Sequence, residues 1–191
     1  MTVGLTGKTC SGKSSLVPFF VERGFAVIDA DVIAHQALEA NADAVRTRFG
    51  TIERSQLGRM VFGDRRALAD LEAITHPWIG REIRDRLSSA QGDVLLNAAL
   101  LNRQDLHKLC DVVVWVHAPL LTRVLRARRR DRWGWLRILK RIWAQRELSP
   151  QVFGRDVDIQ KVDNGGPLAR AFQALEGRFG PHKRIEGTYE K

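Results

Sequence analysis

The stretch Gly7-Lys8-Thr9-Cys10-Ser11-Gly12-Lys13-Ser14 decides the fold, because it satisfies the pattern G-x-x-x-x-G-K-[ST] between two informative flanks. The short apolar run Thr2-Val3-Gly4-Leu5-Thr6 precedes it, and residues 15–23 after it carry apolar side chains at near-helical spacing. A strand, a glycine-rich turn and a helix are the setting in which this pattern cradles phosphate groups. The sequence therefore predicts a nucleotide-binding loop rather than a chance glycine turn.

The expected chemistry of this loop follows from its backbone. Glycines allow successive N–H groups to converge on a polyphosphate, and the following helix adds the positive end of its dipole. We expect Lys13 to lie across the β- and γ-phosphates of ATP and the Ser14 hydroxyl to ligate Mg²⁺. Cys10 could be a redox-sensitive thiol, but we favour a small side chain that the loop tolerates. The loop residues expected to bind ATP are Gly7, Cys10, Ser11, Gly12, Lys13, Ser14 and Ser15.

The composition is typical of a globular protein. The 191 residues are 44% hydrophobic and 28% charged, which suits one main domain with room for a large insertion. No segment approaches the roughly 18 consecutive apolar residues of a membrane helix, and no secretory signal pattern opens the sequence. Cys10 and Cys110 lack metal-ligand spacing and fit a reducing compartment. We therefore expect a cytoplasmic protein without a membrane partner.

The formal charge of +9 is concentrated in one segment. Residues 123–146 contain ten arginines and lysines against the single acid Asp131, whereas the remainder of the chain is close to balanced. A local basic surface indicates either nucleic-acid binding or an enzyme whose two substrates are both polyanions. Trp133, Trp135 and Trp143 lie among the arginines, as in nucleic-acid surfaces. We favour a helical segment that packs over a substrate, rather than a surface for a nucleic-acid partner.

Five apolar runs alternate with helical stretches, which predicts a parallel α/β sheet covered on both faces. The runs lie at 2–6, 26–29, 93–97, 111–116 and 159–162. Helical sequence between 31 and 90 is interrupted near Phe49-Gly50, Gly63-Asp64 and His76-Pro77, and further helices are expected at 120–146 and 167–179. The fold class is a three-layer sandwich of the P-loop NTPase type. Its expected parts are a core of 1–31, 91–119 and 151–191, a helical acceptor insertion of 32–90 and a basic lid of 120–150.

Two aspartates follow the second strand, in Val27-Ile28-Asp29-Ala30-Asp31. Alternation along an extended strand would place Asp29 and Asp31 on one side, and we expect this strand end to border the phosphate loop. A carboxylate there could take a proton from an attacking hydroxyl or help to hold Mg²⁺. The alternative is a helix cap, since Asp is a favoured N-cap. Both roles are compatible if one aspartate caps and the other acts.

Several motifs together resemble those of the dephospho-CoA kinase family. Besides the loop and Asp29-Ala30-Asp31, they are Ile52-Glu53-Arg54-Ser55-Gln56-Leu57 with Val61-Phe62-Gly63-Asp64, Leu71-Glu72-Ala73-Ile74-Thr75-His76-Pro77, Arg130-Asp131 with Arg141 and Gln145, and Asp163-Asn164-Gly165-Gly166. The resemblance spans residues 1 to about 176, and it implies ATP-dependent phosphorylation of the 3′-hydroxyl of dephospho-CoA. ATP and dephospho-CoA would be the partners of a monomer or weak homo-oligomer.

The resemblance also implies roles for single residues. Asp31 would be the general base, Asp29 and Arg54 would serve substrate binding, and Asn164 would lie at the adenine end of ATP. Arg130 and Arg141 would reach the triphosphate from the lid. His76 and Pro77 belong to the acceptor insertion, where His76 either contacts the acceptor or only braces a helix end.

Two stretches depart from the family pattern. Asn97-Ala98-Ala99-Leu100-Leu101-Asn102-Arg103 stands where the family usually has Asp-x-Pro-Leu-Leu-Phe-Glu, so Asn97 brings no negative charge, and Lys8 replaces a second glycine. The alternatives to the leading function are a P-loop kinase for another small hydroxyl acceptor and a non-catalytic nucleotide- or RNA-binding relative.

Overall fold

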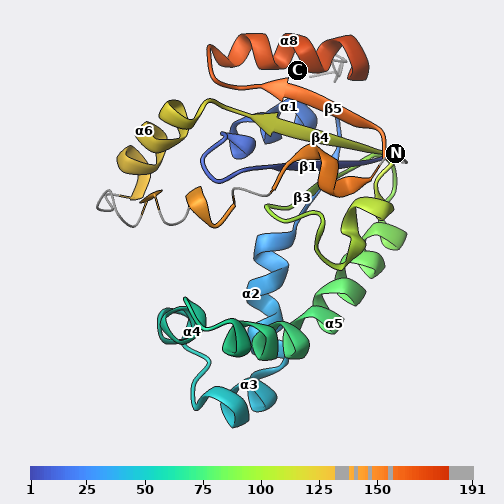
Figure 1. Cartoon of the computed structure of the whole chain (residues 1–191). Helices are drawn as coiled ribbons and strands as arrows, with labels where there is room; N and C mark the ends of the chain where they lie inside the picture. The colour runs from blue at the N-terminus through green and yellow to red at the C-terminus, as the bar shows by residue number, and fades with distance from the viewer. Residues whose placement is uncertain (132–137, 140–141, 146–147, 155–156, 181–191) are drawn as a thin grey trace, which may run out of the picture.

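The computed structural model contains one sheet of five parallel strands in the order β2-β3-β1-β4-β5 (Figure 1). It describes residues 1–131, 138–139, 142–145, 148–154 and 157–180. The strands are β1 (Thr2–Gly7), β2 (Ala26–Asp29), β3 (Val94–Asn97), β4 (Val112–His117) and β5 (Ile159–Asp163). These agree closely with the five predicted runs, because continuous Val, Ile and Leu suit strands that are buried on both faces.

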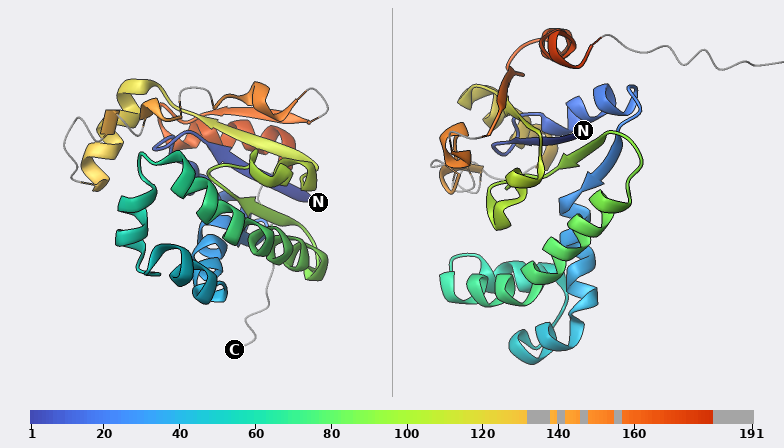
Figure 2. Two further views of the ribbon diagram at one scale, coloured as in Figure 1. Left: turned by 60° about the horizontal axis from the view of Figure 1, so that its bottom comes forward. Right: turned by 90° about the vertical axis from the view of Figure 1, so that its right-hand side faces the viewer.

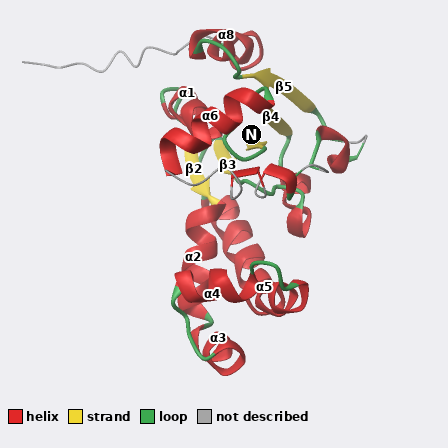
Figure 3. Cartoon of the chain, turned by 60° about the vertical axis from the view of Figure 1, so that its left-hand side comes forward, coloured by secondary structure: helices red, strands yellow, loops and turns green. Residues whose placement is uncertain are grey.

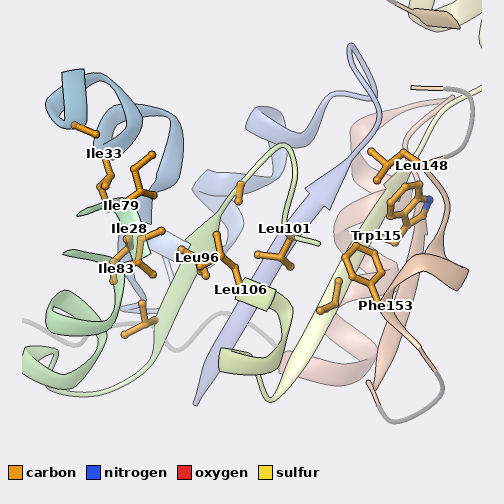
Figure 4. Close-up of a cluster of buried hydrophobic side chains, with 14 residues drawn as sticks. Ile28, Ile33, Ile79, Ile83, Leu96, Leu101, Leu106, Trp115, Leu148 and Phe153 are labelled. Carbon is orange, nitrogen blue, oxygen red and sulfur yellow. The ribbon is translucent and has the colours of Figure 1, made fainter. Parts of the chain in front are cut away.

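Helices and short 3₁₀ turns cover the two faces of the sheet (Figure 2). On one face, α1 (Val17–Val21) and α8 (Leu168–Phe179) enclose a cluster built around Phe19, Phe20 and Leu175. On the other face, a second cluster extends from Ile28 and Ile83 to Trp115 and Phe153 (Figure 4). The three 3₁₀ turns are η1 (Lys13–Leu16), η2 (Arg103–Leu109) and η3 (Pro150–Phe153). The predicted three-layer arrangement is therefore confirmed.

Between β2 and β3 the chain forms four helices that extend away from the sheet (Figure 3). They are α2 (Ala30–Ala40), α3 (Ala42–Phe49), α4 (Arg54–Val61) and α5 (Arg65–Ser89). Three of these helices have an acidic N-cap residue, namely Asp29 in α2, Glu53 in α4 and Asp64 in α5. Each of these side chains accepts hydrogen bonds from two backbone N–H groups of the first turn. The predicted interruptions at Gly50 and Gly63 are confirmed, and both glycines have positive φ.

The predicted break at His76-Pro77 is wrong, because α5 spans 25 residues and continues without interruption through Pro77. Proline removes one helical N–H, so the Ala73 carbonyl loses its donor four residues on. Burial of Ile79 and Ile83 against the α2 side of the core outweighs that loss. Tertiary packing here overrides a local helix-breaking signal.

The basic segment begins as α6 (Leu120–Asp131), which carries Arg123, Arg126 and Arg130. Residues 132–137 and 140–141 lie outside the described part of the chain, as do Trp133, Trp135 and Arg141 with them. In the described segments, every helix is too short or too polar to cross a bilayer.

Candidate active site

The phosphate loop leaves β1 at Gly7 and enters η1 at Lys13, with Ser14 and Ser15 exposed on its first turn. Gly7 has no room for a side chain, because a Cβ there would collide with the Val116 carbonyl of the neighbouring strand. Gly12 has a φ of 86°, and Cys10 adopts the left-handed region with a φ of 61°. A cysteine in that region is uncommon, so its backbone is held by the surrounding contacts.

The carbonyl groups of this loop are held from the outer side by α6 and by the turn after β5. The Arg123 Nε donates to the Thr9 carbonyl at 2.9 Å. Arg126 donates to the Ser11 carbonyl at 2.9 Å and to the Asn164 carbonyl at 2.8 Å. The buried Asn164 amide donates to the Ser11 and Gly12 carbonyls, both at 3.1 Å. These bonds fix the loop in one shape before any phosphate arrives, which is pre-organisation of the kind phosphate binding needs.

Two backbone N–H groups of the loop, those of Thr9 and Ser11, already donate hydrogen bonds within the protein. The Ser11 N–H donates to the Lys8 carbonyl at 3.0 Å, and the Thr9 N–H donates to the Gln145 Oε1 at 2.6 Å. Gln145 thus connects the far end of the basic segment to the phosphate loop.

Lys13 is connected to Asp29 through a buried amide. Its Nζ donates to the Asn97 Oδ1, and the Asn97 Nδ2 donates to the Asp29 Oδ2 at 2.7 Å. Asn97 is 4% exposed and lies at the end of β3, in register with Asp29 on one side and Leu5 on the other. Burial lowers the pKa of the Lys13 ammonium, while the nearby Asp31 and Asp29 carboxylates oppose that shift.

This geometry corrects two expectations about the aspartates. The second strand does not border the phosphate loop, because β3 lies between β1 and β2 and Asn97 fills the gap. The strand ends at Asp29, and Asp31 belongs to the first turn of α2, so strand alternation does not relate the two. Asp29 caps α2 by accepting from the Asp31 N–H at 2.9 Å and the Val32 N–H at 3.3 Å. The Asp31 side chain is exposed beside Lys13.

An open groove of about 640 Å³ separates α5 from η2. Its lining residues are Ala69, Glu72, Ala73, His76, Pro77, Gly80, Arg84, Gln104 and Asp105. Burial lowers the pKa of the His76 imidazole, which favours its neutral form. Gln104 and Asp105 both have left-handed backbones, with φ of 53° and 56°, so the η2 side of the groove is conformationally strained. An Arg103–Glu72 ion pair joins the two sides of the groove.

The remaining predicted site residues are distributed unevenly. Arg54 is exposed at the start of α4 and does not line the groove, and Arg130 is exposed in the last turn of α6. Arg141 lies outside the described residues. Sequence reasoning missed Asn97, Arg123 and Arg126 as site residues. The two arginines share one helix face at i and i+3 directly after β4, a spacing that could have indicated a common target.

The donor groups near the loop suit Mg²⁺. That ion commonly uses one or two protein oxygens together with substrate phosphates and water. The exposed Ser14 hydroxyl and the nearby Asp31 carboxylate provide such oxygens. The described residues contain no cluster of three or more His, Cys, Asp or Glu side chains able to hold a metal without such phosphate ligands.

Comparisons with known proteins agree on one family. The family model described as dephospho-CoA kinase matches residues 1–164. The chain is 33% identical to the dephospho-CoA kinase of Latilactobacillus sakei, with 92% of this chain and 94% of that one covered. It is 35% identical to the dephospho-CoA kinase of Carboxydothermus hydrogenoformans, with 87% and 86% covered. The crystal structure of TT1252 from Thermus thermophilus superposes with a TM-score of 0.78 at 29% identity, covering 93% of this chain and 95% of that one.

Proposed function

Because the chain belongs to the dephospho-CoA kinase family, we propose that it transfers the γ-phosphoryl group of ATP to the 3′-hydroxyl of dephospho-CoA, giving CoA and ADP. The observation that carries the proposal is the Lys13–Asn97–Asp29 chain, which brings the phosphate loop to the start of the helical insertion. Donor phosphates and acceptor hydroxyl would meet where Asp31 lies exposed.

ATP binding is assigned to the loop and its outer supports. The backbone of residues 7–15 would cradle the phosphates, and Lys13 would exchange its bond to Asn97 for the β- and γ-phosphate oxygens. Arg126 and Asn164 are positioning residues, because their bonds to loop carbonyls hold the cradle in shape. In this proposal the turn after β5, which contains Asn164, would lie at the adenine end of the nucleotide.

Asp31 is the base in this proposal, and Asp29 is a positioning residue. Both oxygens of Asp29 are already occupied, by two backbone N–H groups and by the Asn97 amide. Asp31 is free of that duty and would accept the proton of the 3′-hydroxyl as its oxygen attacks the γ-phosphorus. The bond from the γ-phosphorus to the bridging oxygen breaks, and ADP leaves with the electron pair. Arg130 and Arg141 would approach from the lid and stabilise the negative charge of the transferring group.

Mg²⁺ would be held by the Ser14 hydroxyl and by phosphate oxygens of the bound nucleotide. When bound, it neutralises charge on the β- and γ-phosphates.

The groove between α5 and η2 would take the pantetheine arm of the acceptor. Pantetheine carries amides, which need hydrogen-bond partners along the groove. The Ala73 carbonyl, deprived of its helical donor by Pro77, and the neutral His76 imidazole would supply such partners. Arg54 would join only through movement of α4. The cytoplasm, where ATP and reduced thiols occur together, is the proposed location.

The deciding experiment incubates the protein with Mg²⁺, ATP and dephospho-CoA and detects CoA and ADP by mass spectrometry. Wild type should form both in equal amounts, and Lys13→Ala should form neither. Asp31→Asn should lose most turnover while retaining ATP binding, whereas the exposed helix-start control Asp43→Asn should behave as wild type. CoA formation no greater than that of Lys13→Ala would reject the proposal. Normal turnover in Asp31→Asn would reject only the assignment of the base.

A further inference from the structure

A second, smaller pocket of about 320 Å³ opens at the carboxyl end of β4, on the side of β1 opposite to Asn97. Lys8, Arg123 and Ser149 supply its polar lining, and Trp115, Leu120 and Leu148 its main apolar walls. Asn97, Asp31 and the acceptor groove lie toward β3, whereas this pocket lies on the β4 side of the phosphate loop and shares Lys8 with the loop and Arg123 with its outer support. In the described part of the chain, no acidic side chain lines it.

Arg123 is the unusual group in this pocket. Arg123 is only 6% exposed, and its Nε donates a hydrogen bond to the Thr9 carbonyl. Its Nη2 is buried without a hydrogen-bond partner among the described atoms. A buried donor left unsatisfied is costly, and more so when it is charged, so a native structure seldom keeps one without a use.

Lys8 adds a second positive charge to the same pocket. Burial lowers the pKa of Lys8, and the positive charge of Arg123 lowers it further. Burial likewise lowers the pKa of Arg123. Two cations that disfavour each other and are partly removed from water are stabilised by an anion placed between them.

We propose that this pocket binds a small organic anion, with its oxyanion head between Lys8 and Arg123 and a short apolar body against Trp115 and Leu148. The Ser149 hydroxyl offers one further donor to the head. A volume of about 320 Å³ lies at the lower end of ligand pockets, roughly 300–1,000 Å³, which limits the ligand to a few carbon atoms beyond its charged group. The apolar walls predict that an alkyl phosphate binds more tightly than inorganic phosphate, because burying each CH₂ group is favourable.

The test keeps the nucleotide site filled, so that the phosphate loop cannot be the receptor. The full chain, saturated with Mg²⁺ and a non-hydrolysable ATP analogue, is titrated with butyl phosphate by calorimetry. We expect one site per chain, with at least threefold weaker binding of inorganic phosphate. The indole N–H resonance of Trp115, assigned with Trp115→Phe, should shift during the titration.

Two pocket variants and one control variant complete the test. Lys8→Met should weaken butyl phosphate at least tenfold, and Arg123→Met should do the same if it folds, whereas Lys108→Met, exposed and outside this pocket, should not. Lys8 is only partly buried, so Lys8→Met should keep the fold and remains decisive if Arg123→Met does not. The proposal is overturned if the analogue abolishes binding, which would place the anion in the phosphate loop, or if Lys8→Met binds as wild type does. An unmoved Trp115 resonance would also overturn it.

Discussion

Replacing Asn97 tests the link between donor and acceptor halves of the site most directly. The Asn97 amide is the only residue described that bonds both Lys13 and Asp29, and it is 4% exposed. Asn97→Ala removes both bonds and leaves an ammonium and a carboxylate, both partly buried, without their amide partner. We expect folding and turnover to suffer together.

The magnitude follows from the number and type of the lost bonds. A hydrogen bond to a charged group contributes about 1.5–3 kcal/mol, so two such losses, partly relieved by water, amount to about 2–4 kcal/mol of stability. For a chain of this size that corresponds to a melting temperature lower by roughly 5–15 °C. If one of the two bonds positions its group in the transition state, kcat falls about 10- to 100-fold.

The measurements are thermal unfolding and the CoA-forming assay at saturating substrates. The control is Asn41→Ala, which also removes a hydrogen bond donated by a side-chain amide. In this case the acceptor is the Ala37 carbonyl at the end of α2, far from the phosphate loop. It should lose about 1 kcal/mol and no activity. Wild-type kcat together with wild-type stability in Asn97→Ala would refute the reasoning.

Asn97→Asp adds a test with a defined sign. The new carboxylate still accepts from Lys13 but cannot donate to Asp29, so two carboxylate oxygens face each other at the 2.7 Å of the present bond. One shared proton would restore the contact, and like-charge repulsion retains that proton to higher pH than an isolated carboxyl would. The contact is therefore present at low pH and lost as pH rises. The ratio of variant to wild-type kcat should fall between about pH 5 and pH 8; a constant ratio would contradict the account.

Three further predictions address other parts of the molecule. Pro77→Ala restores a backbone N–H that donates to the Ala73 carbonyl, so it should raise the free energy of unfolding by about 1–3 kcal/mol. It should also raise the KM for dephospho-CoA severalfold with kcat unchanged. An unchanged KM would remove the Ala73 carbonyl from the acceptor site. Arg126→Lys keeps the charge but cannot span the Ser11 and Asn164 carbonyls, so the Kd for ATP should rise about tenfold, and wild-type affinity would count against its positioning role. Burial raises the pKa of the Cys110 thiol to about 12, so only about one in ten thousand is thiolate at pH 8, and iodoacetamide should modify Cys110 only after unfolding.

The sequence predicted the strands and the glycine interruptions well because each depends on local chemistry. Runs such as Val112–Val116 are apolar at every position, which only a strand buried on both faces requires. Gly50 and Gly63 adopt positive φ, which glycine tolerates at least cost. Pro77 misled for the opposite reason, because its effect is local while the burial that overrides it comes from α2.

Sequence reasoning singled out candidate site residues that lie within one motif and missed contacts that are assembled across the sheet. Lys13 and Ser14 were singled out from the loop pattern alone, and their roles toward ATP and Mg²⁺ stay predictions. The role of Asn97 depends on β3 lying between β1 and β2, and strand order is not written in any local stretch. Arg123 and Arg126 were counted as part of a charge run, yet both bond loop carbonyls, which gives part of the basic charge a structural use. The assignments of Arg54, Arg130 and Arg141, and the division into core, insertion and lid, stay predictions.

The central place of β1 also governs when the protein can first work during its synthesis. In the sheet register, Thr2 of β1 lies opposite Val94 of β3, and Val3 lies opposite Val112 of β4. The first residues synthesised can therefore pair only after about half of the chain has been made. Long-range parallel pairing of this kind forms slowly, because the entropy cost of closing the loop comes before the stabilising contacts between the strands. We therefore expect the phosphate loop of a ribosome-bound chain to form only after β4 and α6 have emerged. Nucleotide binding would then come late in biogenesis, because a chain truncated before Arg126 lacks residues that hold the loop in shape.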